Sequence, residues 1–169
     1  TEGLAAVLIE FAEKFNVLQH PKYTERLCQE IARRYENDNV ELVVGPVTGG
    51  ILLAHEVGKA LGTRAIFTER DNGKMTLKRG FHIEPGTRVL VVEDIVTTGG
   101  SVKEVMEVVQ EKGGELVGVG LLVDRSGGKV DFGIRTEALL HLNVETFDPN
   151  SCPLCAEGKE FTKRGRTGK

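Results

Sequence analysis

The sequence predicts an α/β fold, a Rossmann-like central parallel sheet of about five strands with helices on both faces. Short apolar runs rich in β-branched residues, such as residues 89–92, alternate along the chain with segments in which apolar residues have helical spacing. Two of these runs end in glycine-rich turns, at residues 45–50 and 97–101, and a helical pattern follows each turn. Since ligands bind beyond the carboxyl ends of parallel strands, we expect both turns at one ligand-binding edge of the sheet.

The first half of the chain is expected to supply three helices and two strands. Apolar residues recur at helical spacing over residues 3–16. A second helix is expected to begin at His20-Pro21, with the proline near its first turn, and to end at about Tyr35. The remaining predicted elements of this half are strands at residues 40–44 and 65–68 and a helix at residues 51–61.

The second half continues the alternation of strands and helices. The polar, basic segment 69–80 is flanked by strands, and Glu84-Pro85-Gly86 has the composition of a turn. The helix after the second glycine-rich turn presents apolar residues from Val102 to Val109 and ends at Gly113-Gly114. The strands predicted here cover residues 81–83, 89–92 and 116–123, and a last strand region covers residues 139–142 and 144–147.

Length and charge limit the classes of protein. The 169 residues are expected to form one domain, residues 1–169, with an N-terminal helix in residues 1–20 that can belong to a small hood and a tail at residues 148–169. A net charge of −3 gives no basic footprint for nucleic acid, and no apolar run reaches the roughly 20 residues that span a bilayer. The start of the chain also lacks a signal-peptide pattern. We therefore expect a cytoplasmic protein with no nucleic-acid or membrane partner.

The cysteines argue against a secreted disulfide framework, because their number, three, is odd. Cys28 lies in a helical pattern and is expected to be a buried small hydrophobic residue. Cys152 and Cys155 form a single CPLC pair, which is half of a zinc site. A metal or redox role for this pair and a plain C-terminal turn both stay open.

The stretch with the clearest chemistry is residues 89–102, in which two carboxylates and a loop of small residues follow a buried strand. Glu93 and Asp94 come directly after the apolar run. In the loop, glycines let backbone N–H groups point inward, hydroxyls add donors, and the next helix adds a partial positive charge. The loop suits a phosphate and the carboxylates suit a diol, with Mg²⁺ offsetting the charge, so a ribose 5-phosphate fits. The loop residues are Thr97, Thr98, Gly99, Gly100 and Ser101.

The run VVEDIVTTGGS resembles the phosphoribosyl pyrophosphate (PRPP) motif of the type I phosphoribosyltransferases. A Walker phosphate loop is excluded, because no GKS or GKT follows the glycines. The resemblance implies that the loop binds the 5-phosphate of PRPP and that Glu93 and Asp94 hold the ribose 2′- and 3′-hydroxyls. It also implies a Mg²⁺ cofactor that is held mainly by PRPP, with no protein ligand firmly assigned to the metal.

The same resemblance assigns pyrophosphate to two other segments. Val47-Thr48-Gly49 stands at the place of the family's pyrophosphate loop, which often contains a non-proline cis peptide, and Val47-Thr48 is the candidate here. Segment 69–80 stands at the place of a mobile catalytic loop, which implies a homodimer whose loop reaches the neighbouring site. From composition alone the segment would be a solvated hairpin loop. The implied pyrophosphate ligands are Arg70, Lys74 and Lys78, with Lys74 neutralising the leaving group.

Arg125 follows the strand at residues 116–123 and precedes two further glycines. Its planar guanidinium can bind a carboxylate or a base edge, and a surface salt bridge to Asp124 is the alternative. Val123-Asp124-Arg125 is similar to the strand end that holds the orotate carboxylate in the orotate-specific members of the family. The resemblance therefore implies phosphoribosyl transfer from PRPP to orotate in pyrimidine nucleotide biosynthesis. A purine or uracil phosphoribosyltransferase and a non-catalytic PRPP-sensing regulator are the alternatives.

Two stretches depart from the family pattern. Thr48-Gly49-Gly50 stands where many relatives have a tyrosine and a lysine, so phosphate contacts there would come from the backbone and from Arg70 and Lys74. Residues 15–18 pass directly from one helical pattern to the next. Orotate-specific members usually have an extended segment there, which contributes to the base pocket.

Overall fold

The computed structural model describes residues 17–142, with residues 156 and 158 beyond them. The expected helix at 3–16, the strand at 144–147, the CPLC pair Cys152 and Cys155 and most of the expected tail lie outside the described residues. The described part is built on a six-stranded sheet with the order β3-β2-β1-β4-β5-β6. Its strands are β1 (Leu42–Pro46), β2 (Arg64–Asp71), β3 (Lys74–Thr76), β4 (Arg88–Val96), β5 (Glu115–Asp124) and β6 (Thr136–His141).

All neighbouring strands are parallel except β2 and β3, which form an antiparallel hairpin at one edge of the sheet. The predicted parallel sheet is confirmed, and it gains a strand because part of the polar segment 69–80 pairs with β2. Asn72 and Gly73 connect the two strands with positive φ angles of 48° and 84°. An Asn-Gly pair with positive φ suits a two-residue hairpin turn.

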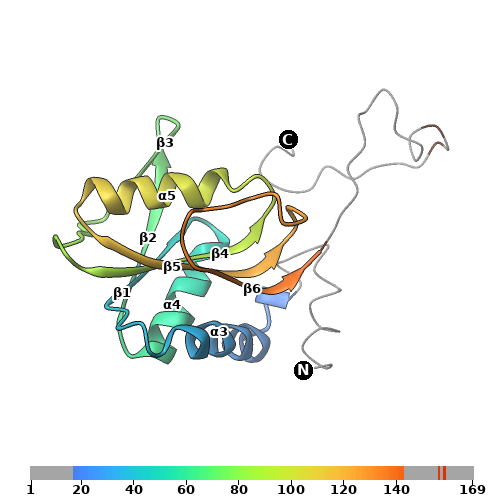
Figure 1. Ribbon diagram of the computed structural model, residues 1–169, viewed down its shortest axis with the longest axis horizontal. Coiled ribbons are helices and arrows are strands. Elements are labelled where there is room, and N and C mark those ends of the chain that lie inside the picture. Colours follow the sequence, from blue (N-terminus) through green and yellow to red (C-terminus); the bar gives the residue numbers. More distant parts are fainter. Residues whose placement is uncertain (1–16, 143–155, 157, 159–169) are drawn as a thin grey trace.

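Helices cover both faces of the sheet, as predicted (Figure 1). The helices α3 (Pro21–Tyr35) and α4 (Gly49–Leu61) pack on one face, and α5 (Gly100–Glu111) packs on the other. Side chains that alternate along β4 divide the two cores. Leu90 and Val92 belong to the core with α3 and α4, whereas Val89 and Val91 belong to the core with α5. Within the described residues, no helix is both long enough and apolar enough to cross a membrane.

The helix α3 has the bounds that the sequence predicted, with Pro21 in its first turn. Cys28 on this helix is fully buried. Burial, together with the charge of Glu56, raises the pKa of the Cys28 thiol to about 12. The thiol therefore stays protonated at neutral pH, which confirms Cys28 as a small hydrophobic core residue.

The predicted strand ends differ from the observed ones, with a large difference at β4, and one predicted strand is absent. β4 continues to Val96, so Glu93 and Asp94 lie inside the strand rather than beyond it. β4 continues because β5 pairs with it along this stretch. Residues 81–83 form no strand, and the Phe81 ring instead packs edge-on against Phe67 with centroids 5.0 Å apart. An apolar run beside a sheet can bury its side chains without backbone pairing, and periodicity alone does not separate the two cases.

Candidate active site

The connections after β1 and β4 leave the sheet on opposite faces. The chain passes from β1 through α4 to β2 on one side, and from β4 through α5 to β5 on the other. Backbone pairing between β1 and β4 ends at Val44 and Val91, although both strands continue further. Where the connections from two adjacent strands leave the sheet on opposite faces, a crevice opens at the carboxyl ends of these strands. Ligands bind in this crevice in open α/β sheets. Both glycine-rich turns of the sequence border this crevice.

The turn after β4 has the features of an anion-binding loop. Gly99 has a left-handed backbone (φ 76°, ψ 2°) and precedes α5, whose first residues are Gly100 and Ser101. No side chain caps the start of α5, and its first turn contains no acidic residue. The first N–H groups of the helix are therefore available, together with the positive end of its dipole. Thr97 and Thr98 are exposed, and all five predicted residues surround a hollow of about 60 Å³.

Glu93 and Asp94 are nearly buried and adjoin different loops. Asp94 is 1% exposed and faces α4, where a Cβ atom at Gly49 would overlap its Oδ2 atom. Glu93 is 8% exposed and lines the hollow of the loop after β4. The Asp94 N–H donates to Oε1 of Glu93 (3.0 Å), and the Ile95 N–H donates to Oδ1 of Asp94 (2.6 Å). The two carboxylates thus connect the loop after β1 with the loop after β4.

The loop after β1 lies against Asp94 through its backbone. The peptide bond between Val47 and Thr48 is cis, at the position that the family resemblance indicated. The Val47 N–H donates to the carbonyl oxygen of Thr68 (2.9 Å), which ties the loop to β2. Gly49 starts α4 and leaves no space for a side chain next to Asp94. A glycine is therefore required at this position.

Arg125 lies at the end of β5, beside the loop after β4 (residues 97–101), which is the candidate phosphate loop. Its N–H donates to the carbonyl oxygen of Val96, the last residue of β4, at 2.8 Å. The alternative salt bridge to Asp124 does not form, because Asp124 contacts Nδ1 of His141 (3.2 Å) and the N–H of Ser126 (2.8 Å) instead. Among the described residues, no carboxylate forms an ion pair with the Arg125 guanidinium. Its charge is therefore available to an anionic ligand.

His141 is a polar residue at this edge that the sequence analysis missed. It ends β6, and its imidazole is 72% exposed while it contacts Asp124. Burial raises the pKa of Asp124, but hydrogen bonds from Ser126 and His141 outweigh burial and hold this pKa below its usual range. His141 could have been predicted as a site residue because it lies at the carboxyl end of a parallel strand, next to Asp124 on the neighbouring strand.

Lys74, one of the three basic residues predicted in segment 69–80, lies away from the phosphate loop of this chain. The Lys74 ammonium lies 3.6 Å from Glu111, at the end of α5 opposite the phosphate loop. At 1.5 Å per helical residue, this is roughly 16 Å along α5 from Gly100. The structure thus brings together the loops after β1, β4 and β5, but not Lys74. Each cation forms an ion pair: Arg70 with Glu104, Lys74 with Glu111, and Lys78 with Asp71.

The acidic residues at the crevice fit a metal ion that a substrate carries. The described residues contain no group of three or more His, Cys, Asp or Glu side chains that could hold a metal ion. Mg²⁺ commonly binds through one or two carboxylates together with substrate phosphates and water. Glu93 and Asp94 can supply that number of carboxylates, so the donor set suits Mg²⁺ held mainly by a phosphorylated sugar.

The fold and the crevice are those of an α/β protein suited to a phosphorylated sugar, and comparison with known proteins specifies its family. The model of the phosphoribosyl transferase domain family matches residues 16–132, and the chain belongs to this family. It is 61% identical over 149 residues to the orotate phosphoribosyltransferase of Desulforamulus reducens, covering 88% of this chain and 78% of that protein. It is 57% identical, with the same coverage, to the orotate phosphoribosyltransferase of Pelotomaculum thermopropionicum.

Solved structures show the same fold. A crystal structure of Mycobacterium tuberculosis orotate phosphoribosyltransferase in complex with Fe(III) dicitrate matches with a TM-score of 0.64 at 26% identity, covering 75% of this chain and 77% of that chain. Adenine phosphoribosyltransferase from Thermoanaerobacter pseudethanolicus matches with a TM-score of 0.63 at 20% identity, covering 75% of this chain and 84% of that chain. The second likeness concerns the fold alone.

Proposed function

We propose that this chain transfers the phosphoribosyl group of PRPP to orotate, giving orotidine 5′-monophosphate and pyrophosphate in pyrimidine nucleotide biosynthesis. The observation that carries the proposal is the 61% identity over 149 residues to the orotate phosphoribosyltransferase of Desulforamulus reducens. The crevice supports it with separate places for a phosphate, a sugar diol and an anionic base. The purine alternative has weaker support, because the likeness to an adenine enzyme is 20% in sequence.

The loop after β4 holds the 5-phosphate of PRPP. The N–H groups at the start of α5 and the threonine hydroxyls donate hydrogen bonds to it, and the helix dipole favours its charge. Glu93 and Asp94 accept hydrogen bonds from the ribose 2′- and 3′-hydroxyls. Asp94 lies against the loop after β1, so this loop is well placed for the pyrophosphate. Its contacts come from Val47, Thr48 and Gly49.

Arg125 binds the carboxylate of orotate through its planar guanidinium. With both substrates held, N1 of orotate, already an anion, bonds to C1 of the ribose. The bond from C1 to the pyrophosphate oxygen breaks, and its electron pair leaves with pyrophosphate. The protein transfers no proton in this step, so its contribution is positioning together with electrostatic stabilisation.

A Mg²⁺ ion bound with PRPP supplies positive charge that offsets the charge of the pyrophosphate. Glu93 and Asp94 would orient the hydroxyls of the sugar beside such an ion. Because both carboxylates are nearly buried, their orientation is fixed before the substrate binds.

A homodimer in which the β2–β3 hairpin serves the neighbouring site also belongs to the proposal. Lys74 lies at the far end of α5 from its own phosphate loop, so reaching its own crevice would require the hairpin to leave the sheet edge. A partner subunit can receive the hairpin without that rearrangement. At the partner's site, Lys74 neutralises charge on the departing pyrophosphate, and the closed hairpin excludes water. The cytoplasmic location expected from the sequence stays a prediction.

Pyrophosphate release tests the reaction and the base together. Purified protein is mixed with PRPP, Mg²⁺ and, one at a time, orotate, uracil, adenine, hypoxanthine or guanine, with reactions lacking a base as controls. We expect release that depends on orotate. Release with purines or uracil but not orotate would contradict the base assignment, whereas PRPP binding without release for any base would support the regulator.

A further inference from the structure

The connection between β5 and β6, residues 125–135, crosses the face of the sheet that α5 covers, without forming a helix. Figure 1 shows this segment, which we call the strap, as the orange loop beside the start of α5. Parallel neighbours are usually joined through a helix that covers the sheet. Here side chains of the strap take that place, because Phe132 is buried in the core under α5 and Val130 and Ile134 pack against the same core.

Both ends of the strap are fixed. At the first end, the Arg125 N–H donates to Val96, and the Val130 N–H donates to Oγ of Ser126 at 3.4 Å. At the second end, the Arg135 N–H groups donate to Asp38 Oδ2 (2.8 Å) and to the carbonyl oxygen of Arg34 (2.7 Å).

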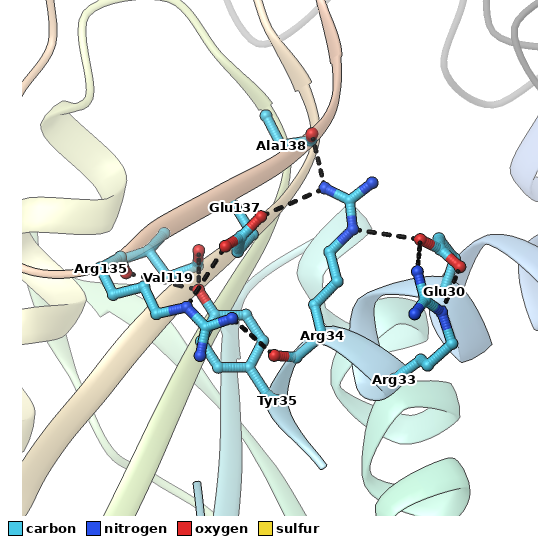
Figure 2. Close-up of polar contacts among 8 residues, drawn as sticks. All are labelled: Glu30, Arg33, Arg34, Tyr35, Val119, Arg135, Glu137 and Ala138. Atoms are coloured by element: carbon cyan, nitrogen blue, oxygen red, sulfur yellow. Dashed lines mark hydrogen bonds and ion pairs between the residues drawn. The ribbon is translucent and has the colours of Figure 1, made fainter. Parts of the chain in front are cut away.

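The second end has further contacts (Figure 2). The Arg135 guanidinium lies 4.6 Å from the centre of the buried Tyr35 ring and also pairs with Glu137. The Tyr35 hydroxyl donates to the carbonyl oxygen of Val119 in β5 at 2.8 Å. With both ends held, the middle of the strap has a defined position over the core.

The middle of the strap lies directly on the phosphate loop. A Cβ atom built on Gly99 would be 2.7 Å from Cγ1 of Val130 and 3.1 Å from Cε1 of Phe132. These two side chains therefore cover the face of Gly99 that a side chain would occupy. Gly99 is the residue whose left-handed backbone turns the chain into α5.

We propose that Phe132 and Val130 are positioning residues for phosphate binding, which they support by holding Gly99 in its left-handed conformation. The N–H groups that follow Gly99 can bind phosphate only if that turn keeps its shape, and a glycine has many alternative backbone conformations. The two side chains fill the space into which the turn would otherwise relax. The strap that carries them also carries Arg125, so the phosphate loop and the base contact share one fixed segment.

The inference rests on the proposed function for the identity of the phosphate ester, so its test uses PRPP binding without any base. Phe132→Ala and Val130→Ala are compared with Ile134→Ala, which removes apolar contact from the same strap and core, while the atoms nearest to the Cβ position of Gly99 belong to Val130 and Phe132. Calorimetry gives the Kd for PRPP with Mg²⁺, and thermal unfolding gives the stability of each variant. Phe132→Leu, which keeps an apolar side chain, serves if Phe132→Ala does not fold.

We expect PRPP affinity to fall about 10-fold in Phe132→Ala and less in Val130→Ala, because small displacements of binding groups have large effects. Ile134→Ala should lose stability while its PRPP affinity stays within about twofold. Equal affinity losses in all three variants, or an unchanged PRPP affinity in Phe132→Ala and Val130→Ala, would overturn the inference. Failure of the unaltered protein to bind PRPP would contradict the proposed function instead.

Discussion

Two regions of this protein are expected to contact phosphate groups, and they are built in opposite ways. The loop after β4 is made of backbone N–H groups held by a buried strand, the start of a helix and the strap. The β2–β3 hairpin and the residues directly after it offer cations at a sheet edge, with Lys74 and Lys78 exposed and Arg70 partly buried. Each of these three predicted ligands forms an ion pair with a carboxylate of the same chain. The first region is preformed for one ligand. The second must exchange its partners to bind one.

The two regions differ in the free energy that ligand binding costs them. A preformed loop has little conformational entropy to lose when phosphate arrives. The hairpin cations must first leave Glu104, Glu111 and Asp71, so their net contribution to substrate affinity is smaller than their charge indicates. We therefore expect the loop after β4 to control PRPP affinity and the hairpin to control turnover.

The largest effect is expected from Gly99→Ala in the preformed loop. The new Cβ atom would meet Val130 at 2.7 Å on a backbone with φ of 76°. Backbone strain and overpacking together cost about 2–4 kcal/mol, so we expect PRPP binding to fall by a factor between about 30 and about 1,000. Calorimetry measures the PRPP affinity, and urea unfolding measures the free energy of unfolding.

Gly86→Ala is the matched control for backbone strain. Gly86 has a φ of 80°, and a Cβ atom there would meet nothing within 4 Å. It should lose about 1 kcal/mol of stability and keep its PRPP affinity. If Gly99→Ala keeps its PRPP affinity as Gly86→Ala does, the left-handed turn at Gly99 is not needed for phosphate binding.

The second largest effect is expected from Lys74→Ala in the hairpin. The Lys74 side chain is 76% exposed, so stability should change by less than about 0.5 kcal/mol. Turnover should fall about 100-fold, because the charge on departing pyrophosphate loses its neutralising partner. Steady-state kinetics and thermal unfolding test both parts, with the exposed Lys112→Ala as the control.

Mixing two inactive variants tests whether the hairpin acts on the neighbouring subunit. Lys74→Ala subunits keep an intact crevice, and Asp94→Asn subunits keep an intact hairpin. If the hairpin serves the neighbouring site, mixed dimers contain one complete site and turnover reappears. Absence of recovery in mixtures shown to exchange subunits would mean that the hairpin acts on its own site or not at all.

Glu104→Gln is expected to increase the affinity for pyrophosphate, and this effect should be smaller than the losses expected from Gly99→Ala and Lys74→Ala. Glu104 accepts a 2.6 Å hydrogen bond from Arg70, and both side chains are partly buried. Weakening this pair removes a competitor for Arg70, so pyrophosphate should bind about threefold more tightly. Glu107→Gln is the control, because Glu107 lines the same hollow of about 430 Å³ between the hairpin and α5. Product-inhibition constants provide the measurement, and weaker pyrophosphate binding in Glu104→Gln would contradict the partner exchange.

The smallest effect is expected from Glu30→Gln, which removes an ion pair on α3, outside both phosphate regions (Figure 2). The hydrogen bond from Arg33, with further help from Arg34, lowers the pKa of Glu30 from 4.5 to about 2. Because the folded-state pKa is lowered, the pair stabilises the fold above about pH 4.5, and this stability is lost as the pH falls toward about 2.

For a partly exposed pair, the expected difference between Glu30→Gln and the unaltered protein is about 0.5–1 kcal/mol near neutral pH. Urea unfolding at about pH 6 and about pH 3 should show the difference shrinking with acidity. PRPP affinity should not change. A difference that is independent of pH would mean that packing rather than charge stabilises this position.

The sequence was informative where chemistry is local. The loop Thr97–Ser101 was predicted residue by residue, because glycines and hydroxyls between a strand and a helix have few other uses. The hairpin could have been predicted more fully, since Asn72-Gly73 is a strong turn signal that the basic composition around it obscured. The ion pairs of its cations could not, because Glu104 and Glu111 are distant in sequence.

By itself, the sequence determined the α/β class and the family, because apolar periodicity and a short motif reflect local backbone requirements, and it predicts a phosphate-binding role for the loop after β4. Only the tertiary structure decided that Asp94 adjoins Gly49 while Glu93 faces the other loop, since a β-strand directs neighbouring side chains to opposite faces and β4 extends past both. It also decided that Arg125 forms no ion pair with a carboxylate of the described residues and that Phe132 covers Gly99. These contacts join residues far apart in the chain, and they depend on packing rather than on any local pattern.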